Sequence, residues 1–112
     1  DVAAQTNLGV MYDRGLGVLE DDARAAYWYT KAAKQGDAKA HANLGLMYAM
    51  GKGLPEDVVQ AYAWFSIAAA RGSATGKKGK MIAAQRMSPA QTAEAQKLSR
   101  EFWEKYVVPF QK

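Results

Sequence analysis

The sequence predicts an all-α fold, a right-handed solenoid of helix–turn–helix repeats. Three observations predict it. The chain repeats itself at a fixed spacing of 36 positions, each unit carries apolar residues at helical spacing, and glycines interrupt each unit near its middle. Units of this length bury their apolar faces by stacking on one another. The 112 residues, of which 49% are hydrophobic and 23% charged, fit a single globular domain.

The repeat is visible in two segments of similar sequence. "NLGVMYDRGLGV" at 7–18 returns as "NLGLMYAMGKGL" at 43–54, which gives the spacing of 36 positions. The same spacing pairs Trp28 with Trp64 and Gly36 with Gly72. We therefore expect one repeat domain over 1–112, which divides into repeat 1 at 1–36, repeat 2 at 37–72, and a degenerate third repeat with a C-terminal capping helix at 73–112.

Each repeat is expected to contain two helices. The first helix of repeat 1 has an apolar stripe at helical spacing, made of Ala4, Leu8, Met11 and Tyr12. Gly15 and Gly17 interrupt it, because glycine adopts turn conformations that other residues avoid. The second helix is expected to start at Asp21 and Asp22, where acids suit the helix dipole, and to stop before Gly36.

Two glycines fall inside expected helices, at the equivalent positions Gly9 and Gly45. A glycine within a helix costs about 1 kcal/mol relative to alanine. We expect close approach of the neighbouring helix to compensate for this cost. The residues expected in the core include Met11, Met47, Trp28 and Trp64.

The segment "RGSATGKKGK" at 71–80 contains the residue types of a phosphate-binding loop but not their order. Such a loop needs G-x-x-x-x-G-K-(S/T) between a strand and a helix. Here three residues separate Gly72 from Gly76, and Lys78 stands at the Ser/Thr position. We interpret the segment as the first helix of the degenerate repeat, with Ser73 as its N-cap. Its apolar residues Met81, Ile82, Ala84 and Met87 are expected to pack on repeat 2.

The last helix is expected to begin in "SPAQ", with Ser88 as N-cap, Pro89 as the first helical residue and Gln91 completing a capping box. Its buried face would consist of Ala95, Leu98, Phe102 and Tyr106, and Pro109 would end it. We interpret 73–108 as the polar-sided terminal unit that a solenoid needs. The other end has no such unit, so we expect either a piece of a longer array or an N-terminal face that meets another subunit.

Both repeats share the pattern A…LG-x-MY-x-x-G-x-G-(V/L)-x-x-D-x-x-x-A-x-x-W-(Y/F)-x-x-A-A-x-x-G over residues 3–72. This pattern resembles the Sel-1-like repeat, a relative of the tetratricopeptide repeat. The segment "MSPAQTAEAQKLSREFW" is similar to the closing segment of many such proteins. The resemblance implies a scaffold or adaptor that binds another protein, often in bacteria and often in the periplasm or outside the cell.

In tetratricopeptide-type arrays the first helices line a concave groove in which partners bind. The register of the Leu-Gly-x-x-Tyr motif carries the groove-facing positions over to Ala3, Thr6, Val10, Asp13 and Arg14 in repeat 1, to Lys39, Ala42, Leu46, Ala49 and Met50 in repeat 2, and to Thr75, Lys78, Ile82, Gln85 and Arg86 in the third. Val10, Leu46 and Ile82 would form an apolar line with a charged rim, as protein and peptide interfaces do. The alternative is that Val10 and Leu46 merely cover neighbouring repeats.

Other functions are disfavoured. The basic cluster from Lys77 to Arg86 is the candidate for RNA or an anionic glycan, but it sits at one end rather than along a groove. Some cysteine-rich members of the family have been linked to weak β-lactam binding or hydrolysis, whereas this chain has no cysteine. The single histidine, His41, corresponds to Gln5 and is expected at an exposed helix position. No catalytic residue, metal site or cofactor is expected. The net charge of +4 is compatible with acidic partners but is not by itself a signature of nucleic-acid binding.

Overall fold

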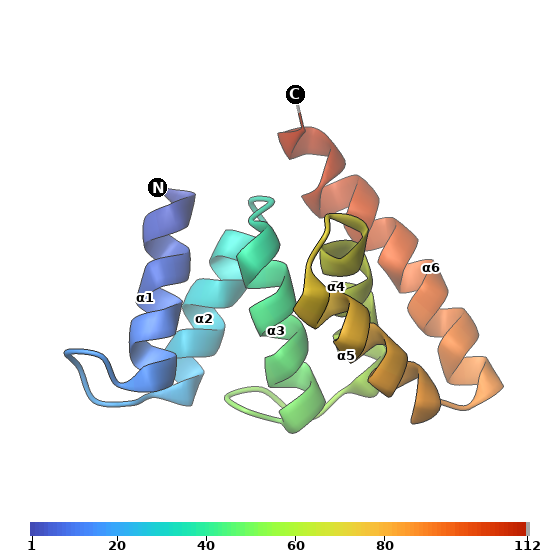
Figure 1. Ribbon diagram of the computed structural model, residues 1–112, viewed down its shortest axis with the longest axis horizontal. Helices are drawn as coiled ribbons and strands as arrows, with labels where there is room; N and C mark the ends of the chain where they lie inside the picture. Colours follow the sequence, from blue (N-terminus) through green and yellow to red (C-terminus); the bar gives the residue numbers. More distant parts are fainter. Residues whose placement is uncertain (112) are drawn as a thin grey trace.

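The computed structural model describes residues 1–111, and in this part of the chain it contains helices and no strand. The helices are α1 (Val2–Arg14), α2 (Asp22–Ala33), α3 (Ala38–Met50), α4 (Val58–Ala70), α5 (Ala74–Gln85) and α6 (Pro89–Tyr106), followed by the short 3-10 helix η1 (Val108–Phe110). Figure 1 shows the successive helix pairs side by side in chain order, from α1 at one end to α6 at the other. The predicted all-α solenoid is confirmed.

Every α-helix begins with a side chain that caps its first turn. The N-cap residues are Asp1, Asp21, Asp37, Asp57, Ser73 and Ser88, and each accepts a hydrogen bond from the backbone N–H three residues further on. Such a cap typically contributes about 1 kcal/mol. The capping box predicted at Ser88 and Gln91 is confirmed, because both of its hydrogen bonds form. The short polar residues before each apolar run therefore fix the helix starts.

Glycines allow neighbouring helices to approach closely, as expected for Gly9 and Gly45. A β-carbon on Gly9 would stand 2.6 Å from the ring of Tyr29, and one on Gly45 would stand 2.6 Å from the ring of Phe65. Gly79 on α5 meets the same Phe65 ring from the other side, again at 2.6 Å. The ring is therefore held between α3 and α5, and a larger residue at either glycine would collide with it.

The packing of α5 differs from the prediction. Met81, Ile82, Ala84 and Met87 were expected on repeat 2. Met87 is half-buried and packs against the cluster that contains Tyr62, but the other three are exposed. The face turned to α4 consists instead of Gly76, Gly79 and the buried Ala83. A β-carbon on Gly76 would lie 2.6 Å from the backbone nitrogen of Ala69, so the two backbones come close together. The glycines of "RGSATGKKGK" thus serve helix packing, which needs small residues rather than large apolar ones.

Helix α6 closes the solenoid by packing mainly on α4. The ring of Phe102 lies 4.3 Å from the Trp64 ring and Tyr106 stacks on it at 5.4 Å, measured between centroids. Ala95 and Phe102 are buried and Leu98 and Tyr106 are half-buried, which confirms the predicted face. The helix ends at Tyr106, three positions before Pro109, so the proline does not itself end it.

His41 contradicts the expectation of an exposed position, because its side chain is fully buried. Its Nε2–H donates a hydrogen bond of 2.8 Å to the carbonyl of Ala33, and its ring stacks on Trp64 at 5.7 Å. Burial lowers the pKa of His41 to about 4, against the opposing effect of the Ala33 hydrogen bond. The residue is a neutral core side chain. The equivalent Gln5 is half-buried and accepts a hydrogen bond from Gln35, so in both repeats this position contacts the C-terminal end of α2.

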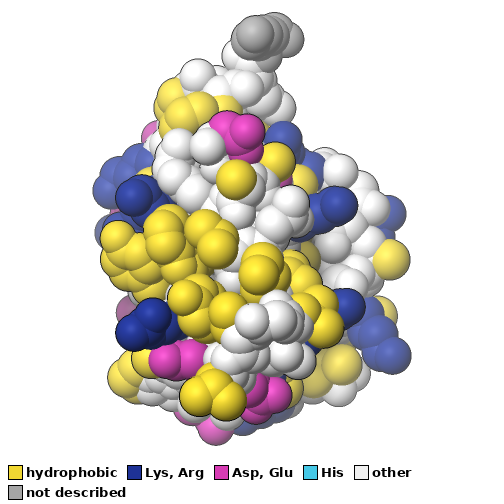
Figure 2. All heavy atoms as spheres, turned by 90° about the vertical axis from the view of Figure 1, so that its left-hand side faces the viewer, with side chains coloured by type: hydrophobic (Ala, Val, Ile, Leu, Met, Phe, Trp, Pro, Cys, Tyr) yellow, Lys and Arg dark blue, Asp and Glu magenta, His cyan; other side chains and the backbone are white. Residues whose placement is uncertain are grey.

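The two repeats are not buried equally. Met47 and Trp64 belong to the core as predicted, whereas the equivalent Met11 and Trp28 remain half-buried on the side formed by α1 and α2. Figure 2, which faces this side, shows apolar side chains gathered across it. Among residues 1–111, no helix combines the length and the apolar character that crossing a bilayer requires.

Candidate protein-interaction groove

An apolar hollow of about 110 Å³ lies between α3 and α5. Its lining consists of Leu46 and Ala49 from α3, Val58 and Phe65 from α4, and Gly79, Ile82, Ala83 and Arg86 from α5. Four residues predicted for the groove, Leu46, Ala49, Ile82 and Arg86, are thus brought to one place. We call this surface, together with Met50 at the end of α3, the α3–α5 groove.

The α3–α5 groove presents apolar side chains to solvent. Leu46 is 36% exposed, Ile82 49% and Met50 59%. Exposing apolar side chains to water is unfavourable, so burying them against a partner would lower the free energy. The exposure of Ile82 follows from the glycine packing of α5, which turns Gly79 and Ala83 inward. A patch of this kind can receive an apolar side chain from another molecule.

The cationic rim of the groove is partly engaged. Arg86 forms an exposed ion pair with Glu56, with 2.7 Å between the guanidinium nitrogen and the carboxylate oxygen. Exposed pairs contribute about 0–1 kcal/mol, so this contact can be exchanged for one with a partner. Lys78 is exposed on α5. Lys80, in the cluster considered for anionic ligands, lies over the ring of Tyr62 at 5.6 Å.

Thr6 and Lys39 line a different, more polar hollow of about 360 Å³ at the starts of α1 and α3. Thr6 is 4% exposed, and its hydroxyl donates to Asp37 at 2.7 Å. Arg71, which also lines this hollow, donates a hydrogen bond to the carbonyl of Gly36. Thr6 therefore joins the two repeats, whereas Lys39 is exposed and free to face a partner.

Asp13 also makes contacts within the protein. Its carboxylate accepts hydrogen bonds from the hydroxyl of Tyr29 at 3.2 Å and from Lys52 Nζ at 2.6 Å. The hydrogen bond to Asp13 raises the pKa of Lys52, and burial followed by the charge of Asp13 raises the pKa of Tyr29. This side chain holds the end of α1 against α2 and against the loop of the next repeat.

The remaining predicted groove residues are divided between core and surface. Val10 is half-buried and packs on the main core, while Ala42 is 7% exposed. Arg14 is exposed in the last turn of α1. The apolar line from Val10 through Leu46 to Ile82 does not form one hollow, because Val10 is absent from the lining around the other two.

Sequence reasoning missed the floor of the groove. Phe65 was one of several apolar residues in the second helix of repeat 2, and Gly79 was one of several glycines in a degenerate segment. The useful signal was Gly76 and Gly79 three residues apart, which places both on one side of α5. That spacing identifies the packed face of the helix and therefore its exposed face.

Comparison with known proteins identifies the family. The Sel1 repeat model matches residues 2–37 and 38–73. The chain belongs to the Sel1 repeat family. Proteins with Sel1 repeats are in general non-catalytic scaffolds for protein interactions. No curated protein matches the sequence.

Two solved structures carry the same repeats. A protective antigen present in uropathogenic Escherichia coli strains, which displays an SLR fold, is 37% identical with a TM-score of 0.94 over 98% of this chain and 24% of its own. A Sel1 repeat protein from Oxalobacter formigenes is 38% identical with a TM-score of 0.70 over 73% of this chain and 62% of its own. The present chain thus spans about a quarter of the first structure. Both neighbours are bacterial, consistent with a bacterial origin.

Proposed function

We propose that this chain is a protein-interaction scaffold that binds a partner protein or peptide in the α3–α5 groove, without a catalytic step. The observation that carries the proposal is the exposed apolar pair Leu46 and Ile82 over the buried ring of Phe65. A partner would insert an apolar side chain between them and offer an acidic group to Arg86. Apolar contacts at the centre and charged contacts at the edge are the arrangement of protein interfaces.

The experiment compares capture of proteins from a lysate of the source cell by the wild type and by Leu46→Glu/Ile82→Glu. Both substituted side chains are partly exposed, so circular dichroism should show unchanged helix content. The matched control is Leu16→Glu/Val108→Glu, which introduces the same two charges outside the groove at side chains of similar exposure, 52% and 49%. A protein recovered by the wild type and the control, but not by the groove variant, supports the proposal. Equal recovery by all three variants contradicts it.

We also infer that Lys39, Lys78 and Arg14, which were predicted for the groove but lie outside the hollow, contact the outer parts of a bound partner together with Met50. Thr6, Asp13, Val10 and Ala42 act through the shape of the scaffold, since their side chains pack or pair within it. Single alanine substitutions at Lys39 and Lys78 should weaken partner binding without changing the melting temperature. Unchanged binding in both would limit the site to the hollow.

Self-association is a second proposed property of the same scaffold. The α1–α2 side exposes Leu16, Val18 and Leu19, and half-exposes Met11. Apolar area of this kind supports contact with another copy or with a further repeat. Sedimentation equilibrium should show a mass that rises with concentration for the wild type and less so for Leu19→Glu. A concentration-independent monomer mass contradicts the proposal.

A further inference from the structure

The internal repeat allows one helix to serve as a reference for another. Positions 36 apart place Tyr27, Thr30, Lys31 and Lys34 of α2 where α4 has Ala63, Ser66, Ile67 and Ala70. On α4 this face is covered by α6, and Ala63 and Ile67 are 0% and 2% exposed. On α2 the same face is open, and Tyr27 is 59% exposed.

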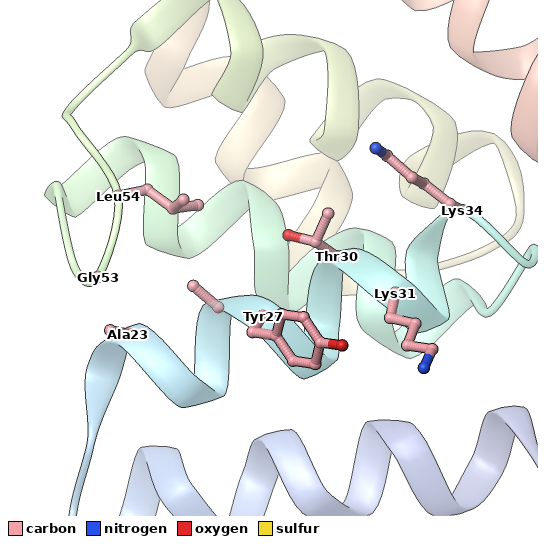
Figure 3. A pocket seen from close by; sticks show the side chains of 8 residues that line it. Ala23, Tyr27, Thr30, Lys31, Lys34, Gly53 and Leu54 are labelled. Atoms are coloured by element: carbon pink, nitrogen blue, oxygen red, sulfur yellow. The ribbon is translucent and has the colours of Figure 1, made fainter.

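The open face of α2 borders a hollow of about 450 Å³. Its lining consists of Ala23, Ala26, Tyr27, Thr30 and Lys31 from α2, the C-cap residue Lys34, and Gly53 and Leu54 from the α3–α4 loop. Figure 3 shows Leu54 directed from the loop toward α2, and Lys31 and Lys34 pointing in opposite directions from the helix. We call this surface the α2 outer face. It belongs to α2, whereas the α3–α5 groove is built by α3, α4 and α5.

Helix α6 shows what kind of segment fits such a face. It is amphipathic, and it lays Phe102 and Tyr106 on Trp64. A smaller hollow lies beside this aromatic contact. It is lined from α6 by Ser99, Arg100, Trp103 and Glu104, and from α4 by Ser66, Ile67 and Ala70. On α2, Trp28 takes the place of Trp64 and remains half-buried, with the ring of Tyr27 edge-on to it and the ammonium of Lys31 over its face at 5.5 Å. An amphipathic helix with aromatic residues one turn apart would cover it in the same way.

The charges of the α2 outer face differ from those of α4, and they select the partner. Ile67 and Ala70 of α4 are replaced by Lys31 and Lys34, so the lining of the α2 hollow contains two cations and no acid. The nearest acids on the helix, Asp21 and Asp22, lie at its other end, where they pair with Arg24 and Lys52. A helix docked here gains from carboxylates at the positions that face Lys31 and Lys34.

We propose that the α2 outer face is a second docking surface, which receives an acidic amphipathic helix of a partner protein. The helix lies on α2 as α6 lies on α4, with its aromatic residues against Trp28 and Tyr27 and its carboxylates beside Lys31 and Lys34. This inference is independent of the groove, since it uses a different face. Binding at both surfaces would allow the scaffold to hold two partners at once.

The test uses synthetic peptides with the sequence of residues 88–106, which retain the N-terminal capping box of α6. The probe peptide carries Arg100→Glu, since Arg100 in α6 stands against the residues that Lys31 and Lys34 replace. The control peptide carries Lys97→Glu, which gives the same net charge but changes the exposed side of the helix. Isothermal titration calorimetry with the full chain measures both affinities. We expect the probe peptide to bind with a dissociation constant in the micromolar range, lower than that of the control peptide by about tenfold or more.

Protein variants locate the bound peptide. The affinity of the probe peptide should fall about tenfold in Lys31→Glu/Lys34→Glu, which reverses the charges, and about tenfold in Tyr27→Ala, which removes the aromatic contact. Lys77→Glu/Lys97→Glu, with the same change of net charge elsewhere on the surface, should bind as the wild type does. All of these side chains are exposed, so the fold is retained.

Three results would overturn the proposal. The first is equal affinity for the two peptides, which would indicate unspecific attraction. The second is unchanged affinity in both α2 variants, which would place the peptide elsewhere, for example on α4 after displacement of α6. The third is the absence of binding by the probe at millimolar concentration. A loss of binding in Leu46→Glu/Ile82→Glu but not in the α2 variants would assign the peptide to the groove instead.

Discussion

The ring of Phe65 lies directly against Gly79, so that a β-carbon on residue 79 would stand 2.6 Å from the ring atom Cε1. The ring cannot move away from it, because Gly45 meets the same ring from α3. Two glycines on helices 34 positions apart in the sequence thus make room for a single aromatic side chain. This contact fixes the distance between α3 and α5 and forms the floor of the groove.

The first prediction concerns Gly79→Ala. Alanine favours the helix by about 1 kcal/mol, but the collision with Phe65 should cost about 1–3 kcal/mol. We expect a net loss of stability of about 1 kcal/mol in urea unfolding. In the background of Phe65→Leu, which removes ring atoms, Gly79→Ala should be neutral or stabilising. A destabilisation of equal size in both backgrounds would show that the ring is not the cause.

The second prediction is a pH dependence of stability caused by His41. Burial lowers its pKa from 6.5 to about 4 in the folded state. Between these two values the unfolded chain binds a proton that the folded chain does not, so stability rises with pH. The contribution of neutral His41 to the free energy of unfolding is fully present above about pH 6.5. It decreases as the pH falls toward 4, by at most about 3 kcal/mol. Urea unfolding between pH 4 and 7.5 measures it.

The matched control for this pH dependence is His41→Gln, which places in repeat 2 the residue that repeat 1 has at position 5. The glutamine amide can donate to the carbonyl of Ala33 and does not titrate. The variant should lose most of the decrease in stability between pH 6.5 and 4 while remaining folded. An unaltered pH profile would assign the dependence to carboxyl groups instead.

The third prediction concerns the contact of α6 with α4. Phe102 is 8% exposed and packs on Trp64, so Phe102→Ala should cost about 3–5 kcal/mol. Because Trp64 then gains contact with water, its fluorescence should shift to longer wavelength. Glu101→Ala, at an exposed neighbour, should change neither quantity by a measurable amount. Retained stability in Phe102→Ala would contradict a capping role of α6.

The fourth prediction compares the two partners of one ion pair. Asp13→Ala removes the acceptor of the buried Tyr29 hydroxyl as well as the partner of Lys52, and should cost about 1–3 kcal/mol. Lys52→Ala leaves Tyr29 paired and should cost about 0–1 kcal/mol, because the lysine is partly exposed. Thermal unfolding of both variants measures the difference. Equal losses would show that the hydrogen bond from Tyr29 contributes little.

The sequence predicts local features of this fold well. The repeat of 36 positions, the caps at Ser73 and Ser88 and the glycine breaks depend on residues close together in the chain, where spacing alone carries the information. His41 was mispredicted because its environment comes from Trp64 and Ala33, which no local pattern places around it. The repeat register indicated that the side chain at this position is polar, but not that it is covered.

The degenerate third repeat shows the same limit for the site. Copying the register of repeat 2 correctly brought Ile82 near Leu46, yet it also placed Met81 and Ala84 against α4. The register fails there because Gly76 and Gly79 allow α5 to come closer and turn a different face inward. The open face of α2 was recognised by comparison with α4, which α6 covers. The sequence could not indicate it, because α4 and α6 make contact through residues far apart in the chain.

The neighbours Trp64 and Phe65 have one further consequence. Trp64 contacts the capping helix on one side of α4, while Phe65 forms the floor of the groove on the other. Because both rings belong to one rigid helical turn, a displacement of α6 that shifts α4 also shifts the surface on which a groove partner rests. We therefore expect a displacement of α6 to change the affinity of the α3–α5 groove for its partner, and partner binding in the groove to alter the packing of α6 on α4 in turn.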